Sequence, residues 1–456
     1  MDLVALGLFL QAYALGLVFL RLRRRWVNHV GAIFIVMATI YNGTPEILVR
    51  LFPGRDPWRP LVQPQYLNQF VLWVSIAIFI FTIVYLVALG KREQPVDPEV
   101  VAAEAERTQK FFNWKIMVLA CIPLVVFTLQ GRGFDANGAI QGTGAGAAAG
   151  FSTQYLMLAV VLASLGFIGR YGPKWVLPVL IVESAVLLTV GQRFFVIAGV
   201  ILTIYGLSRF GIKMRRKQIV VGILFLLAIG LVITSARASQ GRFSPTTTGA
   251  LRFQTLVAGL KHVGSPATRT QLAGDLGYRT DGNSFGAMEL QALNTGQKPL
   301  GITPLRNDAF LAVPSFINPN KDSSDIGVRV EKTWAEEHLA LAQLEISPGV
   351  YRDILPTQLG GTLGWFGPWG MLAIAAILGL IFARLDRWLF RGVGPSRMII
   401  GLSLLYCALL YEGSWSTYTV TARGALLLLV VVWVVKTPRY LATRSRPRIP
   451  ALTAAK

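Results

Sequence analysis

Long, uninterrupted apolar stretches dominate this chain and restrict what it can fold into. Eleven windows contain few or no charged residues and are each about as long as a helix that crosses ~30 Å of hydrocarbon. Lipid offers no partner for a backbone N–H or C=O, so such segments fold as helices, which satisfy their own backbone groups. The windows lie near residues 2–20, 29–47, 66–90, 115–131, 153–169, 175–191, 194–208, 218–236, 363–383, 397–413 and 419–435. The sequence therefore predicts an all-α polytopic membrane protein with about eleven transmembrane helices.

Composition supports this fold class. Hydrophobic residues make up 53% of the chain and charged residues 15%, which is far from the usage of an ordinary soluble protein. The two cysteines, Cys121 and Cys407, both lie inside apolar windows. We interpret both as structural, because a disulfide framework or a cysteine metal site would require them to meet within lipid-buried segments.

The positive charge follows alternate windows along the chain. The net charge is +21, and most of the excess basic residues lie in short segments at 21–25, 91–92, 170–174, 209–217, 384–397 and 436–456. If the helices simply alternate, all of these segments share one side of the membrane. The positive-inside rule assigns that side to the cytoplasm, so the N-terminus is expected outside and the C-terminus inside. This placement indicates membrane topology and argues against a nucleic-acid partner.

One long polar segment, 237–362, interrupts the apolar windows. It contains nearly equal numbers of basic and acidic residues, and the alternation places it on the outer side of the cytoplasmic membrane, periplasmic or extracellular. Turn dipeptides are frequent and no alternating strand pattern repeats, so we expect a helix-and-loop cap leaning on the bundle, with short helices at 251–262 and 333–345. The predicted divisions are 1–236 with helices 1 to 8, 237–362 as the external loop domain, 363–435 with helices 9 to 11, and 436–456 as a basic cytoplasmic tail.

Familiar hydrolase and metal signatures are weak or missing. The run from Gly282 to Gly286 fits the nucleophile-elbow pattern, but that motif requires a buried strand before the serine, and the preceding residues do not read as one. The chain has no HExxH, CxxC or phosphate-binding loop and only three histidines. No metal and no cofactor are therefore expected.

Arginines at the external ends of helices form the clearest candidate site. A guanidinium is always charged and forks onto phosphate oxygens, so several of them converging at a membrane face would bind a diphosphate head group. The simpler alternative is that each arginine snorkels to lipid phosphates. External arginines are, however, less expected under the positive-inside rule. The predicted pyrophosphate-binding residues are Arg193, Arg237, Arg242 and Arg423.

The insert also carries candidates for acid–base work and for sugar contacts. His338 has the side chain whose pKa is nearest neutrality, and Glu289 is the alternative general base; His338 could equally be an ordinary surface histidine. Glu183, inside a helix, is either an interhelical hydrogen-bonding partner or functional. The candidates for contacts with a glycan are Tyr278, Arg279, Asn283, Trp334 and Arg352.

The architecture resembles a known family. The large external loop before the last helices, the turn GQRFF at Gly191 to Phe195, and the passage PTQLGGTLGWFGPWGMLAIAAILGLIFARLD at Pro356 to Asp386 resemble the Wzy-type O-antigen and repeat-unit polysaccharide polymerases. The resemblance implies a metal-independent glycosyltransferase of the GT-C kind in the bacterial cytoplasmic (inner) membrane. Its substrate would be an oligosaccharide linked to a polyprenyl lipid through pyrophosphate, and its protein partners a chain-length regulator or other polysaccharide-assembly proteins. It also implies a role for arginines in external loops, which maps to Arg193, Arg237 and Arg242 here.

Three other readings remain open. O-antigen ligases look similar and use an external histidine, which His338 and Gly349 match in spacing, although Leu339 replaces the expected polar residue. A lipid or solute transporter would usually show internal repeats and broken helices, and no convincing repeat is visible. A noncatalytic scaffold of an envelope-assembly complex is the third.

Overall fold

The structure is a computed structural model that describes residues 2–51, 59–90, 98–112, 152–189, 193–212, 257–268, 281–306, 357–412 and 421–430, with short pieces at 114–118, 218–235, 254, 415–419 and 433–434. Within these residues the regular structure is helical, and no strand occurs. Four helices are long and apolar enough to cross a membrane: α1 (Leu3–Leu22), α2 (Val30–Leu51), α3 (Pro64–Leu89) and α17 (Gln358–Phe390).

The ends of these helices follow local rules. The Asp2 side chain caps α1 by accepting hydrogen bonds from the backbone N–H groups of Val4 and Ala5, at 3.0 and 3.4 Å. Pro64 occupies the first turn of α3, where its missing N–H costs nothing, and Gly90 with φ of +78° ends the helix. Between these signals α3 contains no charged residue, as a lipid-spanning helix requires.

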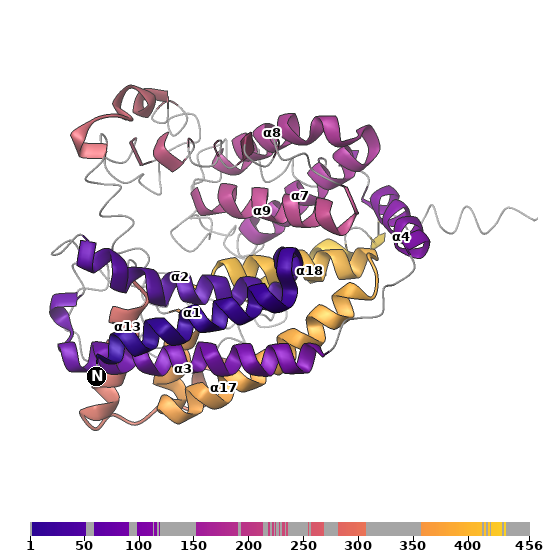
Figure 1. Ribbon diagram of the computed structural model, residues 1–456. Coiled ribbons are helices and arrows are strands. Elements are labelled where there is room, and N and C mark those ends of the chain that lie inside the picture. The colour runs from indigo at the N-terminus through magenta and orange to yellow at the C-terminus, as the bar shows by residue number, and fades with distance from the viewer. Residues whose placement is uncertain are drawn as a thin grey trace, which may run out of the picture.

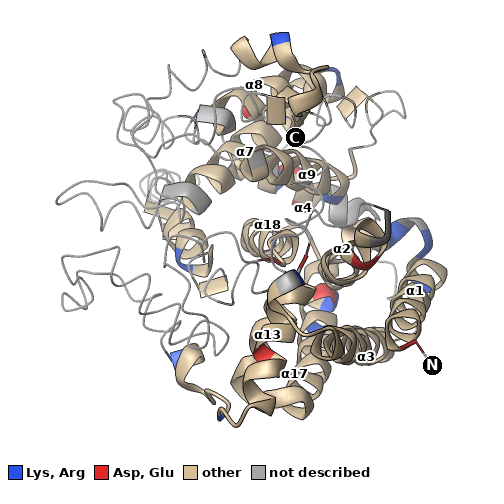
Figure 2. Ribbon diagram, turned by 90° about the vertical axis from the view of Figure 1, so that its left-hand side faces the viewer, with Lys and Arg blue, Asp and Glu red and all other residues tan. Residues whose placement is uncertain are grey.

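The four long helices form one bundle. Seen from one end, α1, α3 and α17 lie in a row, and α2 lies beside α1 and α3 (Figure 2). Phe34 of α2, Phe81 of α3 and Phe382 of α17 pack at the centre with ring centroids 4.8–5.7 Å apart. Burial of such rings contributes to the packing of these helices.

A second group of helices lies beside this bundle (Figure 1). It consists of α7 (Ser152–Tyr171), α8 (Val176–Thr189) and α9 (Arg193–Arg209), and it contacts α18 (Pro395–Leu409), which also packs on α2. Glu183 in α8 accepts hydrogen bonds from the Thr203 hydroxyl of α9 at 2.9 and 3.1 Å, so the interhelical hydrogen bond predicted as one of its two roles is present.

The basic ends of several helices meet at one end of the molecule. Arg21 of α1 donates to the carbonyl of Gly90 at 2.7 Å, and Arg209 of α9 donates to the carbonyl of Gly392 at 2.9 Å. Asp386 of α17 accepts the backbone N–H groups of Val30 and Gly31 at 2.9 and 3.0 Å, which caps the start of α2. We call this the basic end. Glu104 of the short helix α4 (Pro98–Phe111) and Arg397 of α18 also pair here, at 3.5 Å.

The opposite end, which we call the insert end, holds the start of α1, the end of α2, and helix α13 (Asn283–Asn294) (Figure 1). The sequence did not predict α13 as a helix. It packs against α3 and α17, and most of its residues are buried, including Phe285 and Leu290. A β-carbon added at Gly286 would overlap the ring of Phe70 in α3. This part of the polar insert therefore lies within the bundle, whereas a cap leaning on its surface was expected.

Helix α17 starts five residues before the predicted window at 363–383 and bends near its beginning. Gly367 has φ of +71°, a conformation that favours glycine, and Pro368 follows it. The part before the bend is buried and packs beside α13, and its last carbonyls, of Gly364 and Trp365, accept hydrogen bonds from Leu300 and Gly301.

Seven further predicted windows can be compared with the structure. Those at 2–20, 29–47, 66–90, 153–169, 175–191, 194–208 and 397–413 coincide with helices. Most of the window at 115–131 lies outside the described residues, and 218–236 is described only in short pieces, which are helical. The helix at 421–430 covers part of 419–435. The count of eleven spans stays a prediction. Of the two helices predicted inside the insert, 333–345 is outside the described residues, and 251–262 is helical in its described part, which ends in η4 (Leu260–His262).

Candidate functional site

A buried polar cluster lies at the insert end, and it begins on α2. Asn42 and Glu46 are four residues apart, so they lie on one face of the helix, about 18 and 24 Å along it from Val30 at a rise of about 1.5 Å per residue. Asn42 is fully buried and Glu46 is 5% exposed. A carboxylate removed from water in this way must be paired and hydrogen-bonded to be tolerated.

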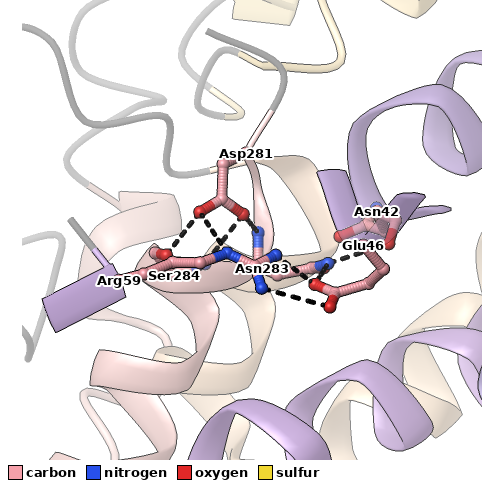
Figure 3. A network of polar contacts seen from close by, with 6 residues as sticks. All are labelled: Asn42, Glu46, Arg59, Asp281, Asn283 and Ser284. Carbon is pink, nitrogen blue, oxygen red and sulfur yellow. Dashed lines mark hydrogen bonds and ion pairs between the residues drawn. The ribbon is translucent and has the colours of Figure 1, made fainter. Parts of the chain in front are cut away.

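Arg59 supplies the charge partner. It lies in η2 (Arg59–Leu61), and its Nη2 and Nη1 donate to Glu46 Oε1 and Oε2 at 2.5 and 3.3 Å. Its Nε lies 3.8 Å from Oδ2 of Asp281. Figure 3 shows the guanidinium between the two carboxylates. One arginine thus bridges two buried acids from segments far apart in the sequence.

The start of α13 completes the cluster. Asp281 Oδ1 accepts the backbone N–H groups of Asn283 and Ser284 at 2.9 and 3.2 Å, and its Oδ2 accepts the Ser284 hydroxyl. Asn283 Nδ2 donates to Glu46 Oε1 at 2.7 Å and to the Asn42 carbonyl at 2.8 Å (Figure 3). The same residues that cap α13 therefore fasten it to α2.

A second polar group surrounds Gln358, the first residue of α17. Its backbone N–H donates to the Tyr411 carbonyl, and its Nε2 donates to the Cys407 carbonyl, both at 3.0 Å. Its backbone carbonyl accepts Trp415 Nε1 and its Oε1 accepts the Tyr418 hydroxyl, again at 3.0 Å. The start of α17 is thereby held inside the bundle by the segment that follows α18.

The two polar groups are connected. Asn42 Nδ2 donates to the Tyr411 hydroxyl at 3.0 Å, and the Gly282 N–H donates to the Tyr41 carbonyl at 3.0 Å. A β-carbon at Gly282 would overlap the Thr357 side chain, so the residue before α13 touches the residue before α17. The two places where the described chain re-enters the bundle from the insert are thus neighbours.

The structure describes three of the predicted site residues with their side chains. Asn283 and Glu289 are fully buried, and Glu289 packs against Gly364 of α17. Arg423 is partly buried in the helix at 421–430. Arg193 begins α9, but its side chain is outside the described part. The other predicted residues also lie outside the described residues: Arg237, Arg242, Tyr278, Arg279, Trp334, His338 and Arg352.

The nucleophile-elbow pattern opens α13. Ser284 is 1% exposed, and its hydroxyl donates to the carboxylate of Asp281. The pair acts in the capping of a helix, and among the described residues the Ser284 hydroxyl donates to Asp281 and not to a histidine.

Asn42, Glu46, Arg59 and Asp281 are not among the site residues predicted from the sequence. A signal was nevertheless present: an Asn and a Glu at i and i+4 inside an otherwise apolar helix imply a buried polar face. Asp281 two residues before Asn283 is also a capping pattern.

Within the described residues there is no group of three or more His, Cys, Asp or Glu side chains placed to hold a metal ion. The acidic groups of the cluster instead pair with Arg59 and with hydrogen-bond donors. Comparisons with protein families, curated proteins and solved structures find no match for this chain.

Proposed function

We propose that the protein is a membrane glycosyltransferase that joins oligosaccharide units carried on polyprenyl pyrophosphate, at the outer face of the bacterial cytoplasmic membrane. The observation that carries the proposal is the buried polar layer at the insert end, which combines residues of the insert with residues of α2. This layer lies at the end opposite the basic helix ends, where the positive-inside rule places the outer side.

The depth of the layer suits a lipid-linked substrate. A polyprenyl chain stays in the bilayer while its pyrophosphate and sugars occupy the interface, so an enzyme acting on it needs polar groups close to lipid depth. Polar side chains at such a depth are costly and are usually retained for function. A soluble substrate would make no use of that placement.

The proposed reaction joins two such units. A hydroxyl oxygen of the acceptor sugar forms a bond to the anomeric carbon of the donor, and the bond between that carbon and the pyrophosphate oxygen breaks. The leaving pyrophosphate takes the electron pair, and the acceptor proton passes to a general base. Arg193, Arg237, Arg242 and Arg423 are the proposed cationic groups that stabilise the developing charge.

Two bases are proposed, and they make different demands. Glu289 is buried between α13 and α17, so it serves only if the acceptor hydroxyl enters the bundle. His338, in the insert, makes no such demand. Tyr278, Arg279, Asn283, Trp334 and Arg352 are the proposed glycan contacts. Asn283 already donates to Glu46, so the cluster would have to rearrange before Asn283 could contact a glycan.

Reconstitution tests the proposal. Purified protein in lipid vesicles is supplied with polyprenyl-pyrophosphate-linked oligosaccharide, and products are resolved on a gel. A ladder of lengthening chains with release of polyprenyl pyrophosphate is the expected result. Transfer of a preformed chain to a different acceptor would indicate a ligase, and movement of the lipid across the vesicle without covalent change would indicate a transporter.

A further inference from the structure

Two aromatic side chains beside the start of α17 are partly exposed yet firmly held. The rings of Trp415 and Tyr418 stack with centroids 5.0 Å apart and an interplanar angle of 27°. Both polar atoms, Trp415 Nε1 and the Tyr418 hydroxyl, donate to Gln358. Gln358 is fully buried, so the two rings are held in place by their polar edges. Since those polar atoms are already engaged, a ligand would contact the pair through the exposed ring faces.

A partly exposed carboxylate lies in the same turn. Glu412 precedes Trp415 by three residues, and its Oε2 accepts the Tyr41 hydroxyl at 2.8 Å. Adjacent Tyr411 accepts the Gln358 N–H through its carbonyl, so Glu412 and the aromatic pair are fastened to one residue. The turn therefore combines a rigid aromatic surface with a hydrogen-bond acceptor.

Among the described side chains that hydrogen bonds join to this segment, carboxylates outnumber arginines, which disfavours a phosphate there; Arg423, proposed for pyrophosphate, lies five residues after Tyr418. Through Tyr41, Asn42 and Gly282 the turn is joined to the cluster in which Arg59 bridges Glu46 and Asp281, so the acids of that cluster outnumber its arginine. Glu412 adds a further carboxylate. A ligand with apolar C–H faces and hydroxyl edges matches this chemistry, because C–H bonds pack on the negative ring face while hydroxyls donate to the carboxylate.

We infer that Trp415, Tyr418 and Glu412 form a binding subsite for a pyranose ring of an uncharged oligosaccharide. The inference rests on the proposed function and deepens it, since it names residues that would contact the sugar rather than the pyrophosphate. The rings are held before the ligand arrives, so binding loses little side-chain entropy.

A binding experiment tests the subsite without requiring turnover. The probe is the water-soluble oligosaccharide released by mild acid from the lipid-linked units of the host membrane, and it is titrated into detergent-solubilised protein by calorimetry. Trp415→Ala should weaken its binding by about tenfold, as expected when one stacked ring is lost. Glu412→Gln, which keeps an acceptor for Tyr41 but removes the charge, should weaken it by a smaller factor. Titration with inorganic pyrophosphate should give the same result for the wild type and both variants.

Trp369→Ala is the matched control. Trp369 is 76% exposed on α17 and touches Trp73 edge-on, so its removal should leave oligosaccharide binding unchanged. Trp415→Phe guards against a folding defect, since it keeps a ring. In that variant the change of tryptophan fluorescence that the oligosaccharide causes in the wild type should be reduced.

The outcomes separate the two claims. If the wild type forms polymer and binds the oligosaccharide, but Trp415→Ala and Glu412→Gln bind it as tightly as the wild type, the subsite is wrong and the proposed function stands. The same unchanged binding, accompanied by a loss of stability in Trp415→Ala, would make the pair an anchor at the membrane interface. If the wild type neither binds the oligosaccharide nor forms polymer, both the proposed function and the subsite fall.

Discussion

Asn283, at the start of α13, donates a hydrogen bond from Nδ2 to Oε1 of Glu46 in α2 over 2.7 Å. The two residues are 237 positions apart in the sequence, and the bond joins the polar insert to the second helix of the chain. Asn283 Nδ2 also donates to the Asn42 carbonyl, so one amide group holds two acceptors of α2.

Asn283→Ala should therefore destabilise the protein. Removing the amide leaves buried acceptors without their donor, which costs about 1–3 kcal/mol. Thermal unfolding in detergent, followed by size-exclusion chromatography, measures the loss. Asn294→Ala is the control, because Asn294 lies on the same helix and donates only to the Leu290 carbonyl one turn earlier. Equal melting temperatures for the two variants would show that the contact with α2 contributes nothing.

Gly286→Ala should weaken the packing of α13 on α3. The added methyl group would overlap the ring of Phe70, and overpacking a filled core costs about 1–3 kcal/mol. Gly16→Ala in α1 provides the comparison, since a β-carbon there meets nothing within 4 Å and alanine favours a helix. The same thermal assay applies, and a Gly286→Ala protein as stable as Gly16→Ala would contradict this packing.

Cysteine labelling checks the orientation of the bundle. Ile302, after α13, is 71% exposed, and Val27, at the basic end, is 43% exposed. In a background without Cys121 and Cys407, Ile302→Cys should react with a membrane-impermeant maleimide added to whole cells with a permeable outer envelope. Val27→Cys should react only after the cytoplasmic membrane is opened. The reverse pattern would place the insert in the cytoplasm and exclude the proposed function.

Arg237 offers a test of phosphate recognition. Arg237→Ala should shorten or abolish the polymer in the reconstituted reaction, because a cation that stabilises the leaving pyrophosphate is lost. Arg237→Lys retains the charge but loses the two parallel N–H donors of the guanidinium, so its activity should fall between those of the wild type and Arg237→Ala. Chain length on a gel is the measurement, and polymer of unchanged length from Arg237→Ala would remove this residue from the mechanism.

Because His29 is buried, we expect the folding stability of the protein to fall at acid pH. His29 precedes α2 at the basic end and is 6% exposed. Its ring packs at a tilt against that of Phe390, with centroids 4.3 Å apart. Burial, followed by repulsion from Arg209 and Arg25, lowers the pKa of His29 from 6.5 to about 4. Asp386, whose carboxylate lies 4.0 Å from Nδ1, is the one acid facing it among the described residues, and it is already engaged by Val30, Gly31 and Tyr85.

The direction of the change in stability with pH follows from proton binding to His29. The unfolded chain binds a proton at His29 below about pH 6.5, whereas the folded protein binds it only below about pH 4, its lowered pKa. Stability should therefore fall across that interval, by up to about 3 kcal/mol. His29→Phe keeps the ring contact and cannot titrate. Its unfolding curves should depend less on pH than those of the wild type, and equal pH dependence would show that His29 is not responsible.

Much of the bundle could be predicted from the sequence because lipid imposes a simple rule on length and hydropathy. The windows that became α1, α2 and α3 are continuous and apolar, and their bounds agree with the structure to within a few residues. The segment that became α13 is short and contains the polar residues Asn283, Ser284 and Glu289. Its helical state depends on the capping by Asp281 and on partners far away in the chain, which periodicity does not report.

The candidate site shows the same limit. Chemistry-bearing residue types in the insert were easy to recognise, and one of them, Asn283, belongs to the polar cluster. Its partner was not readable, because Glu46 lies 237 residues earlier, inside a predicted transmembrane window.

The bend at Gly367 divides α17 into two parts that are both tied down. Gln358 is held to the segment after α18, and Asp386 is held to the start of α2 at the other end of the bundle. The two parts of α17 thus connect the insert end to the basic end, with the bend at Gly367 between their fastened ends. A displacement of Gln358 at the insert end would therefore act on this bend, and through Asp386 on the start of α2.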